Sequence, residues 1–329
     1  MKQKIITKLL GYVKESGSDS LLISKIGKEL FIDYYLPDGS KKRLSVPKKL
    51  EKDFIGSLEN LLEKSRKPDS RQYFKLDDGI SSLNFFLTVI PESGNKRLML
   101  ELKNDKASNY RLNQLGMQAE EKKKFKKALT KKSGLIIISS PAKQGKTSLM
   151  QAAIKELSKS EHSLYAFGKD WSSNEDGVNY SKEACLENLS RIDAEIIFID
   201  NIADQESLKS AINLANSGRL AIISLEADSL WEVLSLINSL KSGRREKFSP
   251  LKLVISSNLA TMKRQGQDGR KIIGLYEALE FDEDLHRFLI NNPEQNNLGF
   301  YKRFLKIAAN KGYRPLAIDR QLKEKNGLL

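Results

Sequence analysis

One short segment, in which an apolar run is followed by a polar loop and then by helical periodicity, constrains the fold of this chain more than any other. Residues 134–139 read GLIIIS, residues 140–147 read SPAKQGKT, and apolar residues then recur at helical spacing to about Ser158. A continuous apolar run of this length is typical of a strand that is buried on both faces, as in a parallel sheet covered by helices. The segment therefore predicts a strand, a loop and a helix within an α/β domain.

The loop carries the residues of a phosphate-binding motif. It matches G-x-x-x-x-G-K-[ST] at Gly145, Lys146 and Thr147, whereas Ser140 stands in place of the first glycine. Backbone N–H groups of such a loop and the N-terminus of the next helix hold phosphates, the lysine neutralises the β- and γ-phosphates, and the threonine hydroxyl ligates Mg²⁺. The alternative is a strand–turn–helix whose lysine is simply exposed. We predict ATP with Mg²⁺ as the ligand, bound by Ser140, Gln144, Gly145, Lys146, Thr147 and Ser148.

A second candidate Mg²⁺ ligand closes another apolar run. Residues 195–200 read EIIFID, so that Asp200 stands at the carboxyl end of a predicted strand. Because the acidic residue of such a site ends a neighbouring strand, we expect Asp200 to hold Mg²⁺ together with Thr147, directly or through water. The next residue is Asn201, whose amide cannot act as the carboxylate base that activates water for hydrolysis.

The pattern of apolar residues changes near residue 103. Before this point, residues 1–16 and 47–65 have helical periodicity, and short alternating runs separated by turn residues predict strands. After it, a lysine-rich helix, the loop segment and further apolar runs predict the doubly covered sheet. We predict a RecA-like P-loop α/β domain with a parallel-type sheet and a helical C-terminal part at 112–329, a smaller mixed α/β (PAS-like) domain at 1–103, and a linker at 104–111.

Composition narrows the function classes. The chain has 329 residues, a net charge of +14 and a single cysteine, Cys185, so no internal disulfide or thiolate cluster can form. No apolar run approaches the roughly 18 residues of a membrane span, and the first residues lack the apolar core and cleavage site of a signal peptide. These features predict a cytoplasmic protein. The lysine-rich stretch at 122–132 is interpreted as a solvated helix face, with a patch for polyanions or a membrane surface as the alternative.

Short motifs occur in a fixed order along nearly the whole chain. Residues 112–116 read LNQLG, residues 134–147 contain the loop, and residues 193–204 read DAEIIFIDNIAD. They resemble the L-x-x-L-G, GLILVTGPTGSGKT and DPDIILVGEIRD motifs of the assembly ATPases of type II secretion and type IV pili (the GspE/PulE type). Further matches fall at residues 17–20, 217–220, 269–277 and 308–312.

The departures from that family pattern concentrate on positions that carry catalysis in the family. The Walker B glutamate matches Asn201, and the arginine of the same motif matches Ala203, although Asp204 is kept. Residues 256–269 pass the place of the family's zinc-binding cysteines without a cysteine, so no zinc site is expected. The remaining catalytic positions match Gly168 and Lys169 for an acidic pair, Arg219 and Glu226 for two histidines, and Phe86 with either Leu100 or Glu101 for two arginines.

A retained loop beside replaced catalytic groups implies a member of this family that binds ATP and hydrolyses it weakly or not at all. Loss of a base or an arginine finger alone lowers a phosphoryl-transfer rate by roughly 10²–10⁵-fold. The resemblance implies a ring of the hexameric type, formed with copies of the chain or with an active paralogue, at a platform protein of the inner membrane. We therefore expect the protein in the cytoplasm, peripheral to the inner face of that membrane.

Two alternatives stay open. In an active but divergent ATPase, Glu226 or Asp204 would replace the missing base, with Glu206 as a third candidate. A basic nucleic-acid-binding module would explain the charge, but the chain has no base-stacking aromatic cluster and no recognisable nucleic-acid motif, so nucleic acid is not the expected partner. The two histidines, His162 and His286, match no family site and are expected at the surface.

Overall fold

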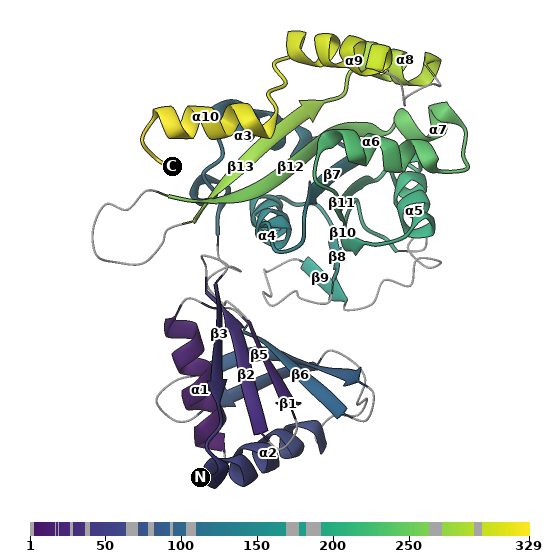
Figure 1. Ribbon diagram of the computed structural model, residues 1–329. Coiled ribbons are helices and arrows are strands. Elements are labelled where there is room, and N and C mark those ends of the chain that lie inside the picture. Colours follow the sequence, from purple (N-terminus) through teal and green to yellow (C-terminus); the bar gives the residue numbers. More distant parts are fainter. Residues whose placement is uncertain are drawn as a thin grey trace. The chain divides into compact units, whose positions relative to one another are not determined.

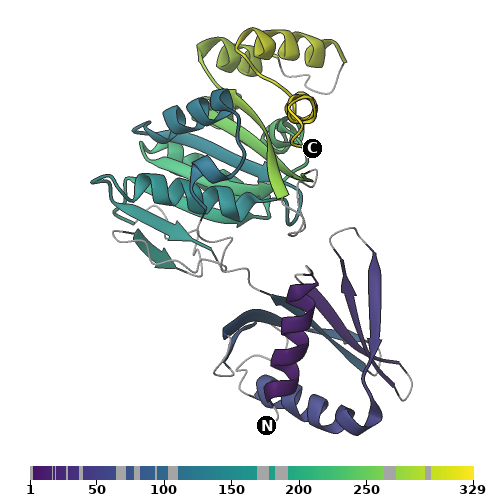
Figure 2. The same ribbon diagram turned by 90° about the vertical axis from the view of Figure 1, so that its left-hand side faces the viewer.

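The chain folds into two compact units, Met1–Lys106 and Ala107–Leu329 (Figures 1 and 2). Each unit has a sheet and helices of its own and is described by itself. The units are seen in a computed structural model, which describes residues 3–16, 18, 20–26, 29–36, 40–63, 72–77, 82–92, 95–102, 110–168, 178–181, 192–262, 272–292 and 298–329.

The first unit contains a six-stranded sheet in the order β3-β2-β1-β6-β5-β4, whose neighbouring strands are antiparallel. Helices α1 (Gln3–Glu15) and α2 (Lys48–Glu63) place Leu10 and Phe54 in the same apolar cluster as Phe85 of the sheet. The small mixed α/β domain predicted from the alternating runs is confirmed. Its strands are β1 (Ser20–Ile26), β2 (Glu29–Tyr35), β3 (Lys41–Ser45), β4 (Gln72–Asp77), β5 (Ser82–Glu92) and β6 (Asn95–Leu102).

The second unit is built on a seven-stranded sheet in the order β13-β12-β7-β11-β10-β8-β9. Neighbouring strands are parallel, except that β13 pairs antiparallel with β12 at one edge. The RecA-like domain with a parallel-type sheet is thus confirmed, and the antiparallel edge strand is an addition that the apolar runs did not predict. Its strands are β7 (Gly134–Ser140), β8 (Leu164–Phe167), β9 (Val178–Ser181), β10 (Ile196–Ile202), β11 (Leu220–Glu226), β12 (Leu251–Thr261) and β13 (Ile272–Glu280).

Helices cover both faces of β7. Alternate residues of this strand face different apolar clusters, since Leu135 and Ile137 pack with α5 and α6 whereas Ile136 and Ile138 pack with α3 and α4. Burial on both faces explains why the strand reads as a continuous apolar run. No helix in the described part of the chain has the length and apolar character that a membrane crossing requires. The helices are α3 (Ala119–Leu129), α4 (Lys146–Leu157), α5 (Gln205–Asn216), α6 (Leu230–Ser239), α7 (Arg244–Phe248), α8 (Glu283–Asn291), α9 (Leu298–Asn310) and α10 (Leu316–Lys325), with a 3-10 turn at Leu112–Gln114.

Helix α3 corrects the interpretation of the lysine-rich stretch. Lys123 and Lys127 are exposed, as expected for a solvated face, but Lys124 is buried. The Nζ of Lys124 donates hydrogen bonds to the carbonyl oxygens of Gly312 at 2.6 Å and Ala278 at 3.4 Å. The prediction of a wholly solvated face is therefore wrong at Lys124, which fastens α3 to β13 and to the turn after α9.

The helical C-terminal part is attached through Glu277 of β13, which is 3% exposed. Its Oε1 accepts a hydrogen bond from the backbone N–H of Leu230 at 2.8 Å. Its Oε2 accepts hydrogen bonds from the Tyr313 hydroxyl at 2.9 Å and from the backbone N–H of Leu316 at 3.1 Å. These contacts join β13 to the first residues of α6 and α10, where a negative charge is favoured by the helix dipole.

Candidate phosphate-binding site

The loop between β7 and α4 has the backbone that a phosphate-binding loop needs. Gly145 is the N-cap of α4 and has a φ of 92°, in the left-handed region that glycine adopts without strain. A Cβ at this position would lie 3.4 Å from a side-chain carbon of Leu259 in β12. Lys143 has a φ of 60°, which costs a residue with a side chain about 1–2 kcal/mol. The loop leads into the first turn of α4, where Thr147 and Ser148 are half-buried.

Lys146, the first residue of α4, folds back over its own loop. It is 9% exposed, and its Nζ donates hydrogen bonds to the carbonyl oxygens of Ser140 at 2.8 Å and Pro141 at 3.2 Å. The Oε1 of Glu226 lies 3.7 Å from the same nitrogen. Burial lowers the pKa of Lys146 below its ordinary value, while the carboxylates of Glu226 and Asp200 act in the opposite direction. The site is therefore built around a buried cation beside two carboxylates.

Strand β12 holds the loop in place. The Oε1 of Gln144 accepts a hydrogen bond from the backbone N–H of Leu259 at 2.8 Å, and the carbonyl oxygen of Gln144 accepts one from the Ser257 hydroxyl at 3.2 Å. The side chain of Gln144, a predicted ligand contact, is thus bound to β12. The fully buried Ser140 donates its hydroxyl to the carbonyl oxygen of Pro141 at 2.9 Å, and its φ is not left-handed. The missing first glycine therefore introduces no backbone strain at Ser140.

A short chain of hydrogen bonds positions Asp200. The Ser224 hydroxyl of β11 donates to Asp200 Oδ1 and accepts a hydrogen bond from the backbone N–H of Asn201 at 2.8 Å. Asn201 is exposed and has a φ of 58°, and the pairing of β10 with β11 shifts register between Ile199 and Ile202. Asparagine tolerates this left-handed conformation better than most residues with a side chain. The bulge leaves Asp200 beside β11 and Asn201 exposed to solvent.

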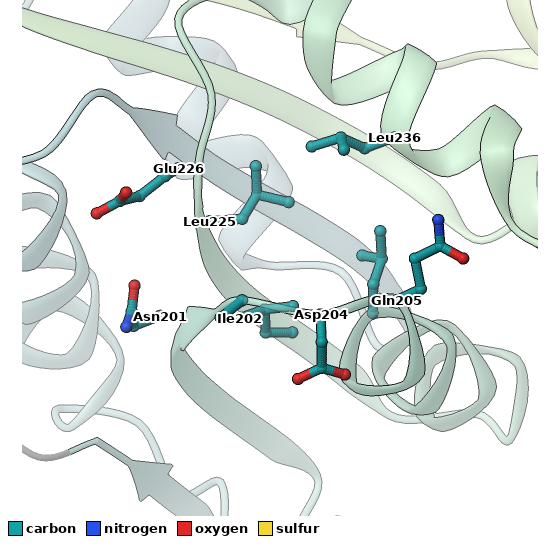
Figure 3. Close-up of a pocket in the computed structure, with 9 residues that line it drawn as sticks. Asn201, Ile202, Asp204, Gln205, Leu225, Glu226 and Leu236 are labelled. Carbon is teal, nitrogen blue, oxygen red and sulfur yellow. The ribbon is translucent and has the colours of Figure 1, made fainter.

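A pocket of about 390 Å³ opens at the ends of β10 and β11 (Figure 3). In Figure 3, Asn201 and Glu226 lie on one side of the pocket, and Asp204 and Gln205 lie on the other. Glu226 both lines the pocket and lies next to Lys146 of the loop. The pocket is lined by Asn201, Ile202, Ala203, Asp204, Gln205, Leu208, Leu225, Glu226 and Leu236.

The candidate bases differ in environment. Asp204 caps helix α5, since its Oδ1 accepts the backbone N–H of Ser207 at 2.8 Å and its Oδ2 accepts the Ser207 hydroxyl at 2.7 Å. These bonds hold the pKa of Asp204 below its usual range. Glu226 ends β11, pairs in register with Ser140, and has a side chain that is 61% exposed. The structure therefore brings Glu226 to the loop and uses Asp204 to begin a helix, while Glu206 is exposed in the first turn of α5.

Arg219, which matches a family histidine, lies away from the loop. Arg219 precedes the other end of β11, where its carbonyl oxygen accepts a hydrogen bond from the first residue of β7. The seven residues of β11 separate Arg219 from the loop by about 20 Å. In the first unit, Leu100 is buried in the apolar cluster, and Phe86 pairs with Glu101 across β5 and β6. Leu100 is therefore a core residue of that unit.

The two histidines differ from each other. His162 is exposed, and its Nδ1 is hydrogen-bonded to Glu195 Oε2 at 2.9 Å. His286 is half-buried, donates its Nε2–H to the carbonyl oxygen of Leu251 at 2.9 Å, and stacks on Phe281. Burial lowers the pKa of His286. The expected surface position is confirmed for His162 and is wrong for His286, which helps to pack α8 against β12.

No group of three or more His, Cys, Asp or Glu side chains gathers as a metal site in the part of the chain that the structure describes. Gly168 is described and is buried just beyond β8. The predictions at Lys169, Cys185 and residues 263–271 lie outside the described residues.

The sequence did not single out Lys143 or Ser224. Lys143 stands where the quoted motif GPTGSGKT has its second glycine, so a letter-by-letter comparison of the loop would have found it. Ser224 is one small polar residue within an apolar strand, and only the pairing of β11 with β10 reveals that it holds Asp200.

Comparison with known proteins shows the family to which this chain belongs. The family model described as "Type II/IV secretion system protein" matches residues 3–287. The type II secretion system ATPase E of Vibrio cholerae is 21% identical over 239 residues, which cover 68% of this chain and 47% of that protein. The type IV pilus assembly ATPase PilB of Acinetobacter baylyi is 25% identical over 211 residues, which cover 61% of this chain and 36% of that protein. The chain spans about half the length of the curated relatives it matches.

Solved structures of an ATPase and a pilus motor share the fold over nearly the whole chain. The ATPase DotB of Legionella pneumophila has a TM-score of 0.73 at 15% identity, covering 99% of this chain and 93% of DotB. The pilus retraction motor PilT, solved with bound ADP, has a TM-score of 0.69 at 15% identity, covering 98% of this chain and 93% of PilT. At these identities the likeness establishes the arrangement of elements.

Proposed function

Because the chain belongs to the type II/IV secretion system protein family, we propose that it binds a nucleotide with Mg²⁺ through the loop between β7 and α4 and hydrolyses it slowly or not at all. The observation that carries this proposal is a contrast within one sheet. The loop keeps a buried Lys146 followed by Thr147, whereas the positions that match the family's Walker B glutamate and arginine hold the neutral Asn201 and Ala203.

The residues of the loop fit a phosphate ligand. The left-handed Gly145 directs the chain into α4, whose first N–H groups have no partner within the helix. Lys146 would exchange the neutral carbonyl oxygens that it now contacts for oxygens of a negatively charged phosphate. Thr147 and Asp200 would hold Mg²⁺, and Ser224 would keep Asp200 oriented. The bound Mg²⁺ supplies charge neutralisation at the β- and γ-phosphates.

Two residues at the end of β10 are poorly suited to supply the base that hydrolysis requires. A residue must orient or deprotonate the attacking water. The amide of Asn201 cannot take up that proton, and both oxygens of Asp204 accept hydrogen bonds from Ser207. Loss of a base or an arginine finger lowers the rate by roughly 10²–10⁵-fold. We therefore propose turnover close to the uncatalysed background, with the nucleotide serving as a structural ligand.

The names of the relatives motivate the wider setting of this proposal. They are a secretion ATPase, a pilus assembly ATPase and a pilus retraction motor. By this likeness, the chain would work as one subunit of a ring, built from its own copies or with an active paralogue, against a platform protein at the cytoplasmic face of the inner membrane. The mass in solution, measured by light scattering with and without ADP–Mg²⁺, tests the ring, and a monomer under both conditions would contradict self-assembly.

Calorimetric titration of the full chain with ADP–Mg²⁺ and ATP–Mg²⁺ tests the binding proposal. We expect saturable binding by the wild type and a loss of at least about 100-fold in affinity in Lys146→Ala, equivalent to about 2.8 kcal/mol. Lys159→Ala is the matched control, since Lys159 is exposed just beyond α4 and carries the same charge. Absence of binding by the folded wild type, or equal loss in both variants, would contradict the proposal.

One observation favours a second candidate, an active but divergent ATPase. Glu226 is an exposed carboxylate 3.7 Å from Lys146 and could take up a proton from water there. Under this alternative, Glu226→Gln abolishes a measurable turnover that Asp204→Asn leaves intact. Phosphate release at background rates in the wild type and in both variants removes this candidate.

A further inference from the structure

Glu226 stands where it can oppose the outermost phosphate of a bound nucleotide. It is the last residue of β11 and pairs in register with Ser140, the last residue of β7, so the two strands deliver them to the same end of the sheet. From there its Oε1 reaches to 3.7 Å from the Nζ of Lys146, with most of the carboxylate still in solvent. The register of β11 against β7 therefore brings Glu226 close to Lys146.

The charge of Lys146 is already opposed before any ligand arrives. Two carboxylates act on it, Glu226 most strongly and then Asp200, and both favour its charged form. The nine residues that line the adjoining pocket include Glu226 and Asp204 but no Lys or Arg. The described side of the site next to Glu226 is therefore acidic or neutral.

The phosphates of a nucleotide differ in how close they would come to this region. In a loop of this kind the backbone N–H groups cradle the α- and β-phosphates, and the lysine reaches the β- and γ-phosphates. A diphosphate can therefore be held mainly by the backbone and Lys146. A γ-phosphate in contact with Lys146 must share it with the carboxylate of Glu226, and like charges at short range repel.

We propose that Glu226 makes this site selective for a nucleoside diphosphate over the corresponding triphosphate. Selectivity is a difference between two affinities, and a repulsive group that meets only one of two ligands is a direct way to create it. The inference rests on the proposed function, because it requires that nucleotide binds at this loop. It adds that the resting ligand is ADP-like and that the triphosphate is the disfavoured form.

Paired titrations of the full chain test the inference. The probes are ADP–Mg²⁺ and the Mg²⁺ complex of a non-hydrolysable β,γ-imido ATP analogue, so that turnover cannot alter the ratio of affinities. For the wild type we expect the diphosphate to bind about tenfold more tightly, equivalent to about 1.4 kcal/mol. In Glu226→Gln, affinity for the triphosphate analogue rises about tenfold and affinity for ADP changes less than about twofold. Glu226→Ala, which removes the carboxylate without introducing an amide, should show the same gain in affinity for the triphosphate analogue.

Asp228→Asn is the matched control. Asp228 is exposed two residues beyond Glu226 and loses the same charge, but it lies outside the lining of the pocket. We expect this variant to keep the wild-type ratio of affinities, with thermal melting confirming that all variants are folded. A gain for the triphosphate in Asp228→Asn equal to that in Glu226→Gln would overturn the specific role of Glu226.

The outcomes separate this inference from the function on which it rests. If the folded wild type binds neither nucleotide, the proposed function fails. If it binds both and the ratio stays the same in Glu226→Gln and Glu226→Ala, binding stands and only the selectivity is overturned. Weaker binding of the triphosphate analogue in these variants would also overturn it, since Glu226 would then assist the γ-phosphate or its metal.

Discussion

The loop after β7 and the ends of β10 and β11 belong to neighbouring strands of one sheet and differ in what they can do. The loop joins a left-handed Gly145, a buried Lys146 and a backbone tied to β12 through Gln144. The strand ends present Asn201 in a left-handed bulge and Asp204 as a helix cap. The first region has the groups of a phosphate-binding loop, and in the second neither Asn201 nor Asp204 is suited to activate water.

The difference shows why binding and hydrolysis can be lost separately. The loop is packed into the fold, because Gln144 is hydrogen-bonded to β12 and a Cβ at Gly145 would lie against Leu259, so its geometry also serves stability. The side chain of Asn201 is exposed, so its replacement leaves no cavity in the core, and asparagine is among the residues that best tolerate its left-handed backbone. A catalytic side chain at that position can therefore be replaced with little effect on folding.

The largest expected effect breaks the loop with Gly145→Val. A branched side chain at a φ of 92°, with a Cβ 3.4 Å from Leu259, strains the backbone and displaces the start of α4. We expect the free energy of unfolding in urea to fall by about 2–3 kcal/mol. Affinity for ADP–Mg²⁺ in calorimetry should fall by about 100-fold or more.

The control for this change is Gly218→Val, at the turn before β11. Gly218 has a φ of 94° and no neighbouring atom within 4 Å of an added Cβ, so it shares the backbone strain but lies at the end of β11 opposite the loop. We expect a similar loss of stability with unchanged nucleotide affinity. Retention of nucleotide binding in Gly145→Val would show that the loop is not the binding site.

The next effect sharpens the comparison by testing whether Asp200 belongs with the loop. Ser224→Ala removes the hydroxyl that donates to Asp200 and accepts the N–H of Asn201. Loss of such an orienting partner lowers metal affinity by about 10–100-fold, so we expect the Mg²⁺-dependent part of ADP affinity to fall about tenfold. Binding measured with a chelator present should stay the same. Stability falls by about 1 kcal/mol, because the half-buried Asp200 and the backbone N–H of Asn201 lose a hydrogen-bond partner.

Ser256→Ala provides the comparison for that variant. It breaks the buried hydroxyl pair between Ser139 and Ser256, 2.8 Å apart, without touching Asp200. We expect a comparable loss of stability and an unchanged Mg²⁺ dependence. Equal losses of affinity with and without Mg²⁺ in Ser224→Ala would reduce Ser224 to a structural role.

A smaller effect is expected at Asp204, one of the acidic residues in the region at the ends of β10 and β11. Asp204→Ala removes the cap of α5 and should lower stability by about 1 kcal/mol at pH 7. The pKa of Asp204 is lowered in the folded chain, so the ionised carboxylate stabilises fully above its unfolded pKa of about 3.9 and loses this contribution as the pH falls through the folded value. The difference from the wild type in urea unfolding should therefore shrink below about pH 4.

Nucleotide assays on Asp204→Ala decide whether Asp204 only caps α5 or also takes part in catalysis. Asp204→Ala should leave both affinity and phosphate release unchanged, as should Glu206→Gln in the exposed first turn of α5. Reduced turnover in Asp204→Ala alone would assign Asp204 to catalysis and reverse the contrast between the two regions.

The smallest effect concerns the strain left inside the loop. Lys143 has a φ of 60°, so Lys143→Gly should relieve about 1–2 kcal/mol of strain, offset by the greater freedom of glycine in the unfolded chain. We expect a net gain of about 0.5–1 kcal/mol and a rise in Tm of about 1–4 °C by calorimetry. Lys143→Ala removes the same charge but keeps the strain, and it should not stabilise. A lower Tm in Lys143→Gly would show that this backbone is unstrained.

Much of the fold could be predicted because it depends on local patterns. The apolar run of β7 and the run that closes on Asp200 identify two buried parallel strands from the order of the residues alone. The burial of Lys124 could not be predicted, since its carbonyl partners lie 154 and 188 residues away in the chain. Helical periodicity places Lys124 on a face but does not say what else packs there.

The residues of the candidate site also divide into those that the sequence could predict and those that it could not. The loop residues are contiguous, so their spacing carries the information, whereas Ser224 and Asp200 meet only through the pairing of β10 with β11. Matching of Arg219 to a family histidine placed it next to β11 but did not show that it lies at the end of the strand opposite the loop. The left-handed backbone conformation of Lys143 and Asn201 could not be predicted, because the amino-acid sequence does not specify the φ angle of a residue.

The most direct test of the contrast is phosphate release from ATP–Mg²⁺, measured for the wild type and Lys146→Ala in samples whose nucleotide affinity is titrated in parallel. We expect the wild type to bind nucleotide and to release phosphate no faster than Lys146→Ala, which does not bind. A wild-type rate well above background that disappears in Lys146→Ala would contradict the proposed separation of binding from hydrolysis.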